Sequence, residues 1–410
     1  MKHFRLPAIL AIALSLACGN AAWGQEDTRG SRNIRVAGHF LIDGGTAGLA
    51  VEQAPDRPYA YLAMRGEQGG FVALDLTDIA SPAPVARWPR AETGGRDLTL
   101  FARQGRQYLV LATSSGAVVV DVTGMPDESR LQEAARIPEE RGFRGLFAYR
   151  HSDGRALLLA TGGGPVFVYD LAGVLDGTGG LVSTFDTPEQ VDAATSGFDA
   201  VFAGYEPDSG QDRLYGAGGG GYYVYDFSDP ANVRLLVSIS SAAVQRGRAI
   251  APTPDGRYVL TAAGYRTAPL RIFDLQAALD GDLPRIRTAV GAWTADWRND
   301  YTDLQVRWPF LFAAALEDGM HIVNIRDPLN PYTDAYYRTT PGKPDAGLSA
   351  APRGIFRVAV RNHDGLIVAS DLDTGFWAFY LEAFSGWHGH AWGMPHMSDA
   401  QDWENGPDGK

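Results

Sequence analysis

The chain has 410 residues, of which 45% are hydrophobic and 20% are charged, and it contains 49 glycines and 24 prolines. This is the composition of a globular protein with an ample core, which excludes disordered and collagen-like classes. The formal net charge of −12 argues against nucleic acid as a partner, because an acidic surface repels phosphates. No stretch after the N-terminus approaches the roughly 20 apolar residues that a transmembrane helix needs.

The first 24 residues have the pattern of an export signal. Basic residues at positions 2, 3 and 5 precede an apolar run over 6–17, and Ala22 and Gly24 supply the small residues for cleavage after Gly24. The sequence therefore predicts a signal peptide over 1–24, a disordered linker over 25–35 and an exported protein, periplasmic or extracellular.

The alternative to cleavage after Gly24 is a lipid anchor at Cys18. Cys18, the single cysteine, follows Leu14-Ser15-Leu16-Ala17, which resembles a bacterial lipoprotein cleavage box except that Ser15 stands where Leu is expected. Cleavage before Cys18 would leave a lipidated N-terminal cysteine. Cleavage after Gly24 would leave a mature chain without cysteine, whose stability comes from packing rather than disulfides.

The rest of the chain is built from a repeated unit. Each unit contains a short apolar strand that usually begins with glycine and closes with one recurring residue, most often aspartate, as in GYYVYD (221–226). A turn follows this residue, which occupies the fixed position of the repeat. Intervals of about 46 to 56 residues between strand-rich units are typical of propeller blades. The fixed position is occupied in order by Asp75, Asp121, Asp170, Asp226, Asp274, Asn324 and Tyr380.

Each complete unit has four strand-like segments, which in the second unit are 98–101, 107–112, 117–122 and 131–137. The first three are strongly apolar and the fourth is amphipathic, as expected for an outer edge strand. Turns rich in glycine, asparagine and aspartate separate them.

The last unit lacks one strand, and the isolated segment 36–42 has no partner nearby in sequence. Pairing 36–42 into the last unit would close a ring. The sequence thus predicts an all-β, seven-bladed propeller over 36–385 with four-stranded antiparallel blades, followed by a tail over 386–410.

The aspartate after the third strand has two interpretations. It accepts backbone N–H bonds where the strand ends, or it belongs to a ring of metal ligands. The first is favoured, because these positions lie in the outer half of each blade and cannot converge.

The unit GYYVYDFSDP (221–230), with GFVALDLTD (70–78), resembles the repeat of the LVIVD-repeat family of exported bacterial β-propellers. The resemblance covers about residues 36–385 and implies the propeller fold, while the family carries no common assigned reaction. Asn324 and Tyr380 depart from the repeat in the last two units.

Charged residues recur where the innermost strand of a blade begins, the position that lines the central funnel. Arginines there suit carboxylate or phosphate groups, and aspartates suit hydroxyls, amines or a cation. This pattern predicts a binding or scaffold module for a protein, a peptide or an anionic small molecule. The alternative is that these charges pair between neighbouring blades and stabilise the ring. The candidate residues are Arg96, Asp97, Arg144, Asp199, Arg248, Asp303 and Arg353.

An enzyme with its site at this mouth is the competing class: a periplasmic hydrolase, lyase or oxidoreductase. The sequence has no Gly-x-Ser-x-Gly motif for a serine nucleophile, and the one cysteine makes a thiol enzyme implausible. The prediction therefore leans away from catalysis.

Two metal hypotheses remain, while no cofactor is required by the pattern. The tail holds His388, His390 and His396 with Met394. Imidazole and thioether ligands together suit copper, so a copper-handling protein is a third hypothesis. In the alternative, the tail tryptophans pack across a propeller face and the histidines are solvated. Asp371 and Asp373 suggest a calcium loop, although two carboxylates fall short of calcium's usual six to eight oxygens.

Overall fold

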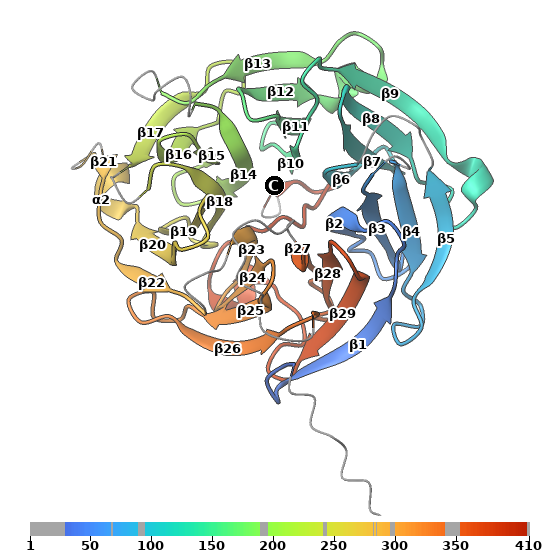
Figure 1. Ribbon diagram of the computed structural model, residues 1–410. Coiled ribbons are helices and arrows are strands. Elements are labelled where there is room, and N and C mark those ends of the chain that lie inside the picture. Colours follow the sequence, from blue (N-terminus) through green and yellow to red (C-terminus); the bar gives the residue numbers. More distant parts are fainter. Residues whose placement is uncertain are drawn as a thin grey trace, which may run out of the picture.

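The computed structural model describes residues 29–66, 69–88, 95–188, 196–240, 244–281, 283, 285–295, 300–340 and 353–407. These residues form seven sheets arranged radially around a central axis (Figure 1). The predicted all-β, seven-bladed propeller is confirmed.

The first three blades follow the chain order, with each innermost strand first. Blade 1 comprises β2 (Thr46–Val51), β3 (Tyr59–Met64), β4 (Phe71–Asp75) and β5 (Ala83–Trp88). Blade 2 comprises β6 (Leu98–Arg103), β7 (Arg106–Thr113), β8 (Gly116–Asp121) and β9 (Gln132–Pro138), with η1 (Glu128–Arg130) before β9. Blade 3 comprises β10 (Gly145–Arg150), β11 (Ala156–Thr161), β12 (Val166–Asp170) and β13 (Leu181–Phe185), with α1 (Leu171–Leu175) after β12.

The fifth blade's chain adds a short strand to the fourth blade. Blade 4 comprises β14 (Phe198–Glu206), β15 (Gln211–Gly218), β16 (Gly221–Asp226) and β17 (Arg234–Ile239). Blade 5 comprises β18 (Gly247–Pro252), β19 (Tyr258–Ala263), β20 (Leu270–Asp274) and β22 (Gly291–Trp293), with α2 (Gln276–Leu279) after β20. Before the chain reaches β22, the two-residue β21 (Arg285–Ile286) pairs in parallel with β17, giving blade 4 a fifth strand.

The last two blades return to four strands each. Blade 6 comprises β23 (Tyr301–Arg307), β24 (Phe310–Ala315), β25 (Gly319–Asn324) and β26 (Tyr332–Tyr337). Blade 7 comprises β27 (Ile355–Val360), β28 (Ile367–Asp371), β29 (Gly375–Leu381) and β1 (Ile34–Phe40).

The N-terminal strand closes the ring as the sequence predicts. β1 runs antiparallel to β29, with Ile34 opposite Leu381 and Phe40 opposite Phe376. Pairing starts earlier than expected: β1 begins at Ile34 rather than residue 36, and Gly30, placed by sequence in a disordered linker, forms a bridge with Tyr337 of β26. Residues 1–28, including the predicted signal peptide and Cys18, lie outside the described residues.

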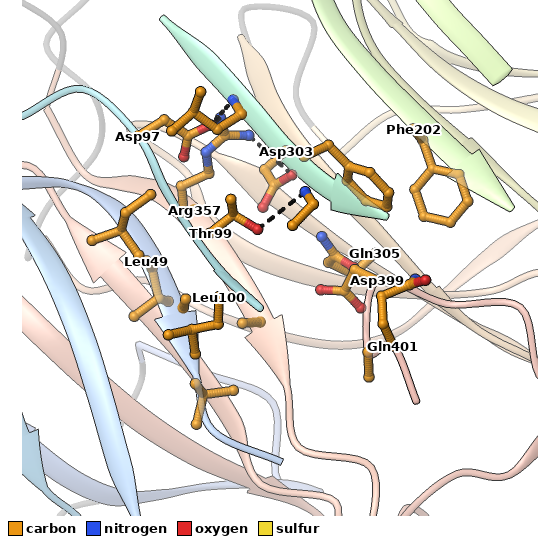
Figure 2. A pocket seen from close by; sticks show the side chains of 18 of the residues that line it. Leu49, Asp97, Thr99, Leu100, Phe202, Asp303, Gln305, Arg357, Asp399 and Gln401 are labelled. Atoms are coloured by element: carbon orange, nitrogen blue, oxygen red, sulfur yellow. Dashed lines mark hydrogen bonds and ion pairs between the residues drawn. The ribbon is translucent and has the colours of Figure 1, made fainter. Parts of the chain in front are cut away.

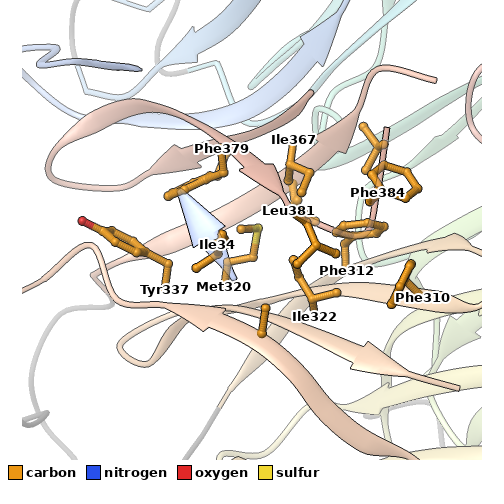
Figure 3. Packing of buried hydrophobic residues seen from close by; sticks show 14 of the residues in the cluster. Ile34, Phe310, Phe312, Met320, Ile322, Tyr337, Ile367, Phe379, Leu381 and Phe384 are labelled. Carbon is orange, nitrogen blue, oxygen red and sulfur yellow. The ribbon is translucent and has the colours of Figure 1, made fainter. Parts of the chain in front are cut away.

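Apolar cores lie between neighbouring blades, one cluster at each of the seven junctions. Figure 3 shows the junction of blades 6 and 7, where Ile34 of β1 packs among Met320, Phe379 and Tyr337. The strand that closes the ring is thus also part of a core, because alternate side chains of a sandwiched sheet face the two adjacent blades.

The repeated aspartate performs the local role that the sequence favours. Asp75 accepts a bond from the Thr77 amide at 2.7 Å, and Asp226 accepts one from the Ser228 amide at 3.1 Å. Equivalent i to i+2 bonds form at Asp121, Asp170, Asp274 and Asn324. Each satisfies a backbone donor as the chain leaves its third strand.

The repeated glycine before the third strand has a steric cause in several blades. Gly221 has φ +138°, and a Cβ there would lie 2.2 Å from the Ile239 carbonyl oxygen of the adjacent strand. Gly116 shows the same conflict with the Ile137 carbonyl, at 1.9 Å. A residue with a side chain would push the third and fourth strands apart at these turns.

Helices are few and short in the described ranges, where the longest is the five-residue α1. Across those same ranges, no helix has the length and apolar character that crossing a membrane requires.

Candidate functional site

The seven innermost strands stand around the propeller axis (Figure 1). Their side chains line a channel along this axis. Its cavity has a volume of about 300 Å³, and residues of every blade line it. We call the side where the innermost strands begin, next to Asp97 and Asp303, the start face, and the side where they finish, next to Arg307, the end face.

One arginine joins three blades within this channel (Figure 2). Arg357 of β27 donates to Asp97 at 2.8 Å and to Asp303 at 3.3 Å. Asp97 also accepts from the Leu146 amide of blade 3, and Asp303 from the Val358 amide of blade 7, both at 3.0 Å. The group therefore stabilises the ring while placing charge on the axis.

Burial dominates the electrostatics of these two carboxyl groups. It raises the pKa of Asp97 and of Asp303 above the ordinary value, although the positive charge of Arg357 acts in the opposite direction. For Arg357, burial lowers the guanidinium pKa, but the two carboxylates outweigh this and hold the pKa above its usual range. Within the described residues, the buried Nε of Arg357 has no hydrogen-bond partner.

The channel also has apolar lining. Blades 3, 4 and 5 contribute Phe147, Val201, Phe202 and Ile250 to the lining. The rings of Phe147 and Phe202 lie 4.9 Å apart between centroids at 50°. The cavity is thus amphipathic, because carboxylates of blades 1, 2, 4 and 6 line it together with the aromatic rings of blades 3 and 4.

The C-terminal tail forms the floor of the channel at the end face. Asp399, Ala400, Gln401 and Trp403 all line the cavity, and the red C-terminal segment reaches the centre of the ring in Figure 1. Gln401 accepts a bond from the Arg150 amide at 3.2 Å.

Asp399 anchors this floor to blade 6. Arg307, which is fully buried, donates to Asp399, and the Gln305 amide, oriented with its nitrogen toward this carboxylate, donates to both oxygens at 3.0 Å. The predicted tail over 386–410 is, in its described part up to residue 407, packed against the propeller.

Three of the seven predicted site residues line the channel: Asp97, Asp199 and Asp303. The arginines lie elsewhere. Arg96, Arg144 and Arg353 lie one or two positions before the innermost strands β6, β10 and β27, and they are exposed around the start face. We call these three the rim arginines; they form no ion pair with any other described residue.

Some of these charged residues form ion pairs between neighbouring blades, as the alternative hypothesis from the sequence expects. Asp199 of blade 4 is bound by Arg246, which precedes blade 5, at 2.8 and 2.9 Å. The Nε atom of Arg248 in blade 5 lies 3.7 Å from Oδ1 of Asp300, just before blade 6. The sequence identified the paired aspartates but not their partners Arg246 and Arg357.

Arg357 and Asp399 are the site residues that sequence reasoning missed. Arg357 left a signal, since it is the one charged residue in the apolar strand IFRVAV. Its direction could not be read from the sequence, because a register shift between Ile355 and Arg357 changes which side chains face the axis. Similar shifts open β14, β18 and β23.

The tail histidines stack rather than surround a common point. The rings of His388 and His396 are 4.3 Å apart between centroids and inclined by 27°, and the His390 ring is 5.0 Å from that of His388 at 34°. Nitrogen lone pairs lie in the ring planes, so stacked rings do not aim at one ion. In the part of the chain that the structure describes, no group of three or more His, Cys, Asp or Glu side chains is arranged to hold a metal.

Trp387 supports the packing alternative for the tail. It is 5% exposed, and its indole N–H donates to the Trp308 carbonyl at 3.0 Å. Trp392 is 45% exposed and lies beneath Arg326.

Asp371, half of the suggested calcium loop, is fully buried and engaged by protein donors. It accepts from Thr339 and, at 2.9 Å each, from the amides of Asp373 and Thr374. Its contacts are those of a strand-end turn.

Comparison with protein-family models gives no match for this chain, and neither does comparison with curated proteins. The fold and the geometry of the channel therefore carry the functional argument.

Proposed function

We propose that this chain is an exported β-propeller of the LVIVD-repeat type that works as a binding or scaffold module. Its partner is anionic: an acidic segment of a protein, a peptide or a small anion, bound at the start face. The observation that carries the proposal is the position of the rim arginines, three exposed guanidiniums around the mouth of the channel.

The chemistry of the rim supports an anionic partner. Arg96, Arg144 and Arg353 stand on blades 2, 3 and 7, so their charges are spread over one side of the mouth. A guanidinium with its donors facing solvent can form forked hydrogen bonds with a carboxylate. Because the chain as a whole carries a net charge of −12, a local cluster of cations distinguishes this face from its surroundings.

Catalysis finds less support than binding. A general acid and base must reach a substrate with a proton to exchange. Asp97 and Asp303 are instead held by Arg357 and by backbone amides.

A fluorescent deca-glutamate peptide tests the proposal by anisotropy at low salt. Reversing all three rim charges (Arg96→Glu, Arg144→Glu and Arg353→Glu) is expected to weaken binding at least tenfold. The matched control reverses three exposed arginines away from the rim: Arg130→Glu, Arg287→Glu and Arg326→Glu. Equal weakening in both triple variants would show an effect of net charge alone and would refute a rim site.

Export is part of the proposal, on the strength of the N-terminal sequence. Cell fractionation of the wild type and of Cys18→Ala separates its two forms. A soluble exported protein is unaffected by the substitution, whereas a lipoprotein moves from the membrane fraction to the soluble one. Retention of the wild type in the cytoplasm would contradict both.

A further inference from the structure

The charges that line the channel do not balance. Five carboxylates belong to its lining: Glu52, Asp97, Asp199, Asp303 and Asp399. Three of them have an arginine each, since Glu52 pairs with Arg57, Asp199 with Arg246 and Asp399 with Arg307.

The remaining two carboxylates share one cation. Asp97 and Asp303 both bind Arg357, so four guanidiniums serve five carboxylates and one negative charge is left over. Both residues are buried, at 5% and 7% exposure. An uncompensated charge in such a place is costly, and it attracts a cation or a proton.

The cavity around this pair has the size and surface of a small-molecule site. Its volume of about 300 Å³ is at the lower end of the range for ligand pockets. The Phe147 and Phe202 rings line the same cavity as the carboxylates, and they would cover the apolar part of a ligand. Aromatic faces also attract organic cations.

We propose that the axial channel binds a small organic amine, with its ammonium group at Asp97 and Asp303 and its apolar body against Phe147 and Phe202. A metal ion fits this place poorly, because Arg357 bridges the two carboxylates and no metal-binding group is found in the described ranges. An anion is excluded electrostatically, since every lining carboxylate would repel it.

The tail determines the direction of entry. Asp399, Gln401 and Trp403 cover the channel at the end face, so the amine enters from the start face, between the rim arginines. The amine is a second ligand, distinct from the anionic partner, and its binding does not depend on the rim arginines.

Calorimetry of the full chain with three matched probes tests this assignment. Phenethylammonium carries the charge and the ring, 2-phenylethanol has the ring without the charge, and 3-phenylpropionate reverses the charge. We expect phenethylammonium to bind at one site per chain and at least tenfold more tightly than either of the others. Equal or tighter binding of phenylpropionate, or no binding of phenethylammonium up to about 10 mM, overturns the proposal.

Substitutions locate the site. Asp303→Asn removes the excess charge and is expected to weaken phenethylammonium binding about tenfold or more. Asp75→Asn makes the same change in net charge at an outer strand end, where the equivalent Asn324 already forms the same turn, and is expected to leave binding unchanged. Should Asp303→Asn fail to fold, Phe202→Leu tests the aromatic wall with the charges intact, again with weaker binding expected.

Calorimetry with phenethylammonium also separates the amine site in the channel from the anion site at the rim. The triple rim variant that loses the glutamate peptide is expected to keep its affinity for phenethylammonium. Binding of phenethylammonium that survives Asp303→Asn and Phe202→Leu would place it outside the channel and would refute the inference, whatever the peptide does.

Discussion

At the residue scale, Arg357 determines the chemistry of the axis. A buried guanidinium between two carboxylates leaves less than one full positive charge for each of them, so both aspartates remain sensitive to protonation. Their environment contrasts with that of Asp226, at a strand end on the outside of blade 4. There burial raises the pKa, but hydrogen bonds from Arg234 and the Ser228 amide outweigh it and hold the pKa below its ordinary value.

This contrast predicts opposite pH dependences for two isosteric substitutions. The raised pKa of Asp97 means that the folded state holds its proton longer than the unfolded state. The stability contributed by this group is present below the unfolded pKa, near 3.9, and is lost as pH rises through the folded pKa. Asp97→Asn should therefore remove a decline in the free energy of unfolding that starts near pH 4 and continues as pH rises through the raised pKa of Asp97.

Asp226→Asn is the control with the opposite sign. Its contribution is present above the unfolded pKa and disappears as the solution is acidified through the lowered folded pKa. Urea unfolding at a series of pH values measures both. If the difference between Asp97→Asn and the wild type does not change with pH, the assigned burial effect is wrong.

Gly221 offers a test of the repeat itself. A β-carbon there meets the Ile239 carbonyl at 2.2 Å in a positive-φ conformation, so Gly221→Ala should destabilise the fold by about 1–3 kcal/mol or more. Gly164→Ala is the matched control, with no heavy atom within 4 Å of the added carbon. Thermal unfolding should show a clear loss for the first and little change for the second; comparable effects would mean that the repeated glycine has no steric role.

At the scale of elements, the blades could be predicted because the residues that specify each strand and turn lie close together in sequence. The glycine, the apolar run and the aspartate lie within about ten residues, and each contact they need is with an adjacent turn or strand. The missing strand of the last unit then pointed to β1. The start face could be located for the same reason, since it follows from where each innermost strand begins.

Other features of the site depend on geometry that no local pattern contains. Register shifts at the start of β14, β18, β23 and β27 decide which charged residue faces the axis. Asp399 meets Arg307 across 92 residues of chain, and nothing near either residue indicates the other. Sequence therefore found the aspartates of the channel, but neither the arginine between them nor the tail that closes it.

The packing of β1, the strand that closes the ring, predicts a measurable contribution to stability. Ile34 of β1 is 8% exposed within the core between blades 6 and 7, so Ile34→Ala should cost about 2–5 kcal/mol of unfolding free energy. Leu41→Ala, seven residues later and 60% exposed, should cost close to nothing. Equal values from urea unfolding would mean that β1 is not packed into this core.

At the scale of the whole molecule, ring closure brings the separate blades to one axis. Arg357, Asp97 and Asp303 come from blades 7, 2 and 6, and Arg357 reaches Asp97 only because blade 7 lies beside blade 1 in a closed circle. If the circle opened between β1 and β29, the shared arginine, the channel and the rim would all lose their geometry. The functional proposals therefore depend on the pairing of these two strands.

A disulfide across that pairing is the most direct test. Arg35 lies opposite Tyr380, and its guanidinium stacks over the Tyr380 ring at 5.2 Å, so both side chains are on one face. Directly paired residues in antiparallel strands have Cβ atoms about 4.5–5.5 Å apart, within easy adjustment of a disulfide. Arg35→Cys with Asp373→Cys is the control, because Asp373 lies beyond the opposite end of β29.

The measurement is the mass and thiol content of the oxidised Arg35→Cys/Tyr380→Cys protein, with the linked peptides identified after digestion. The closed ring predicts near-complete formation of an intramolecular disulfide in this variant and free thiols in the control. Free thiols at positions 35 and 380 in the folded protein would contradict the closure on which the channel rests.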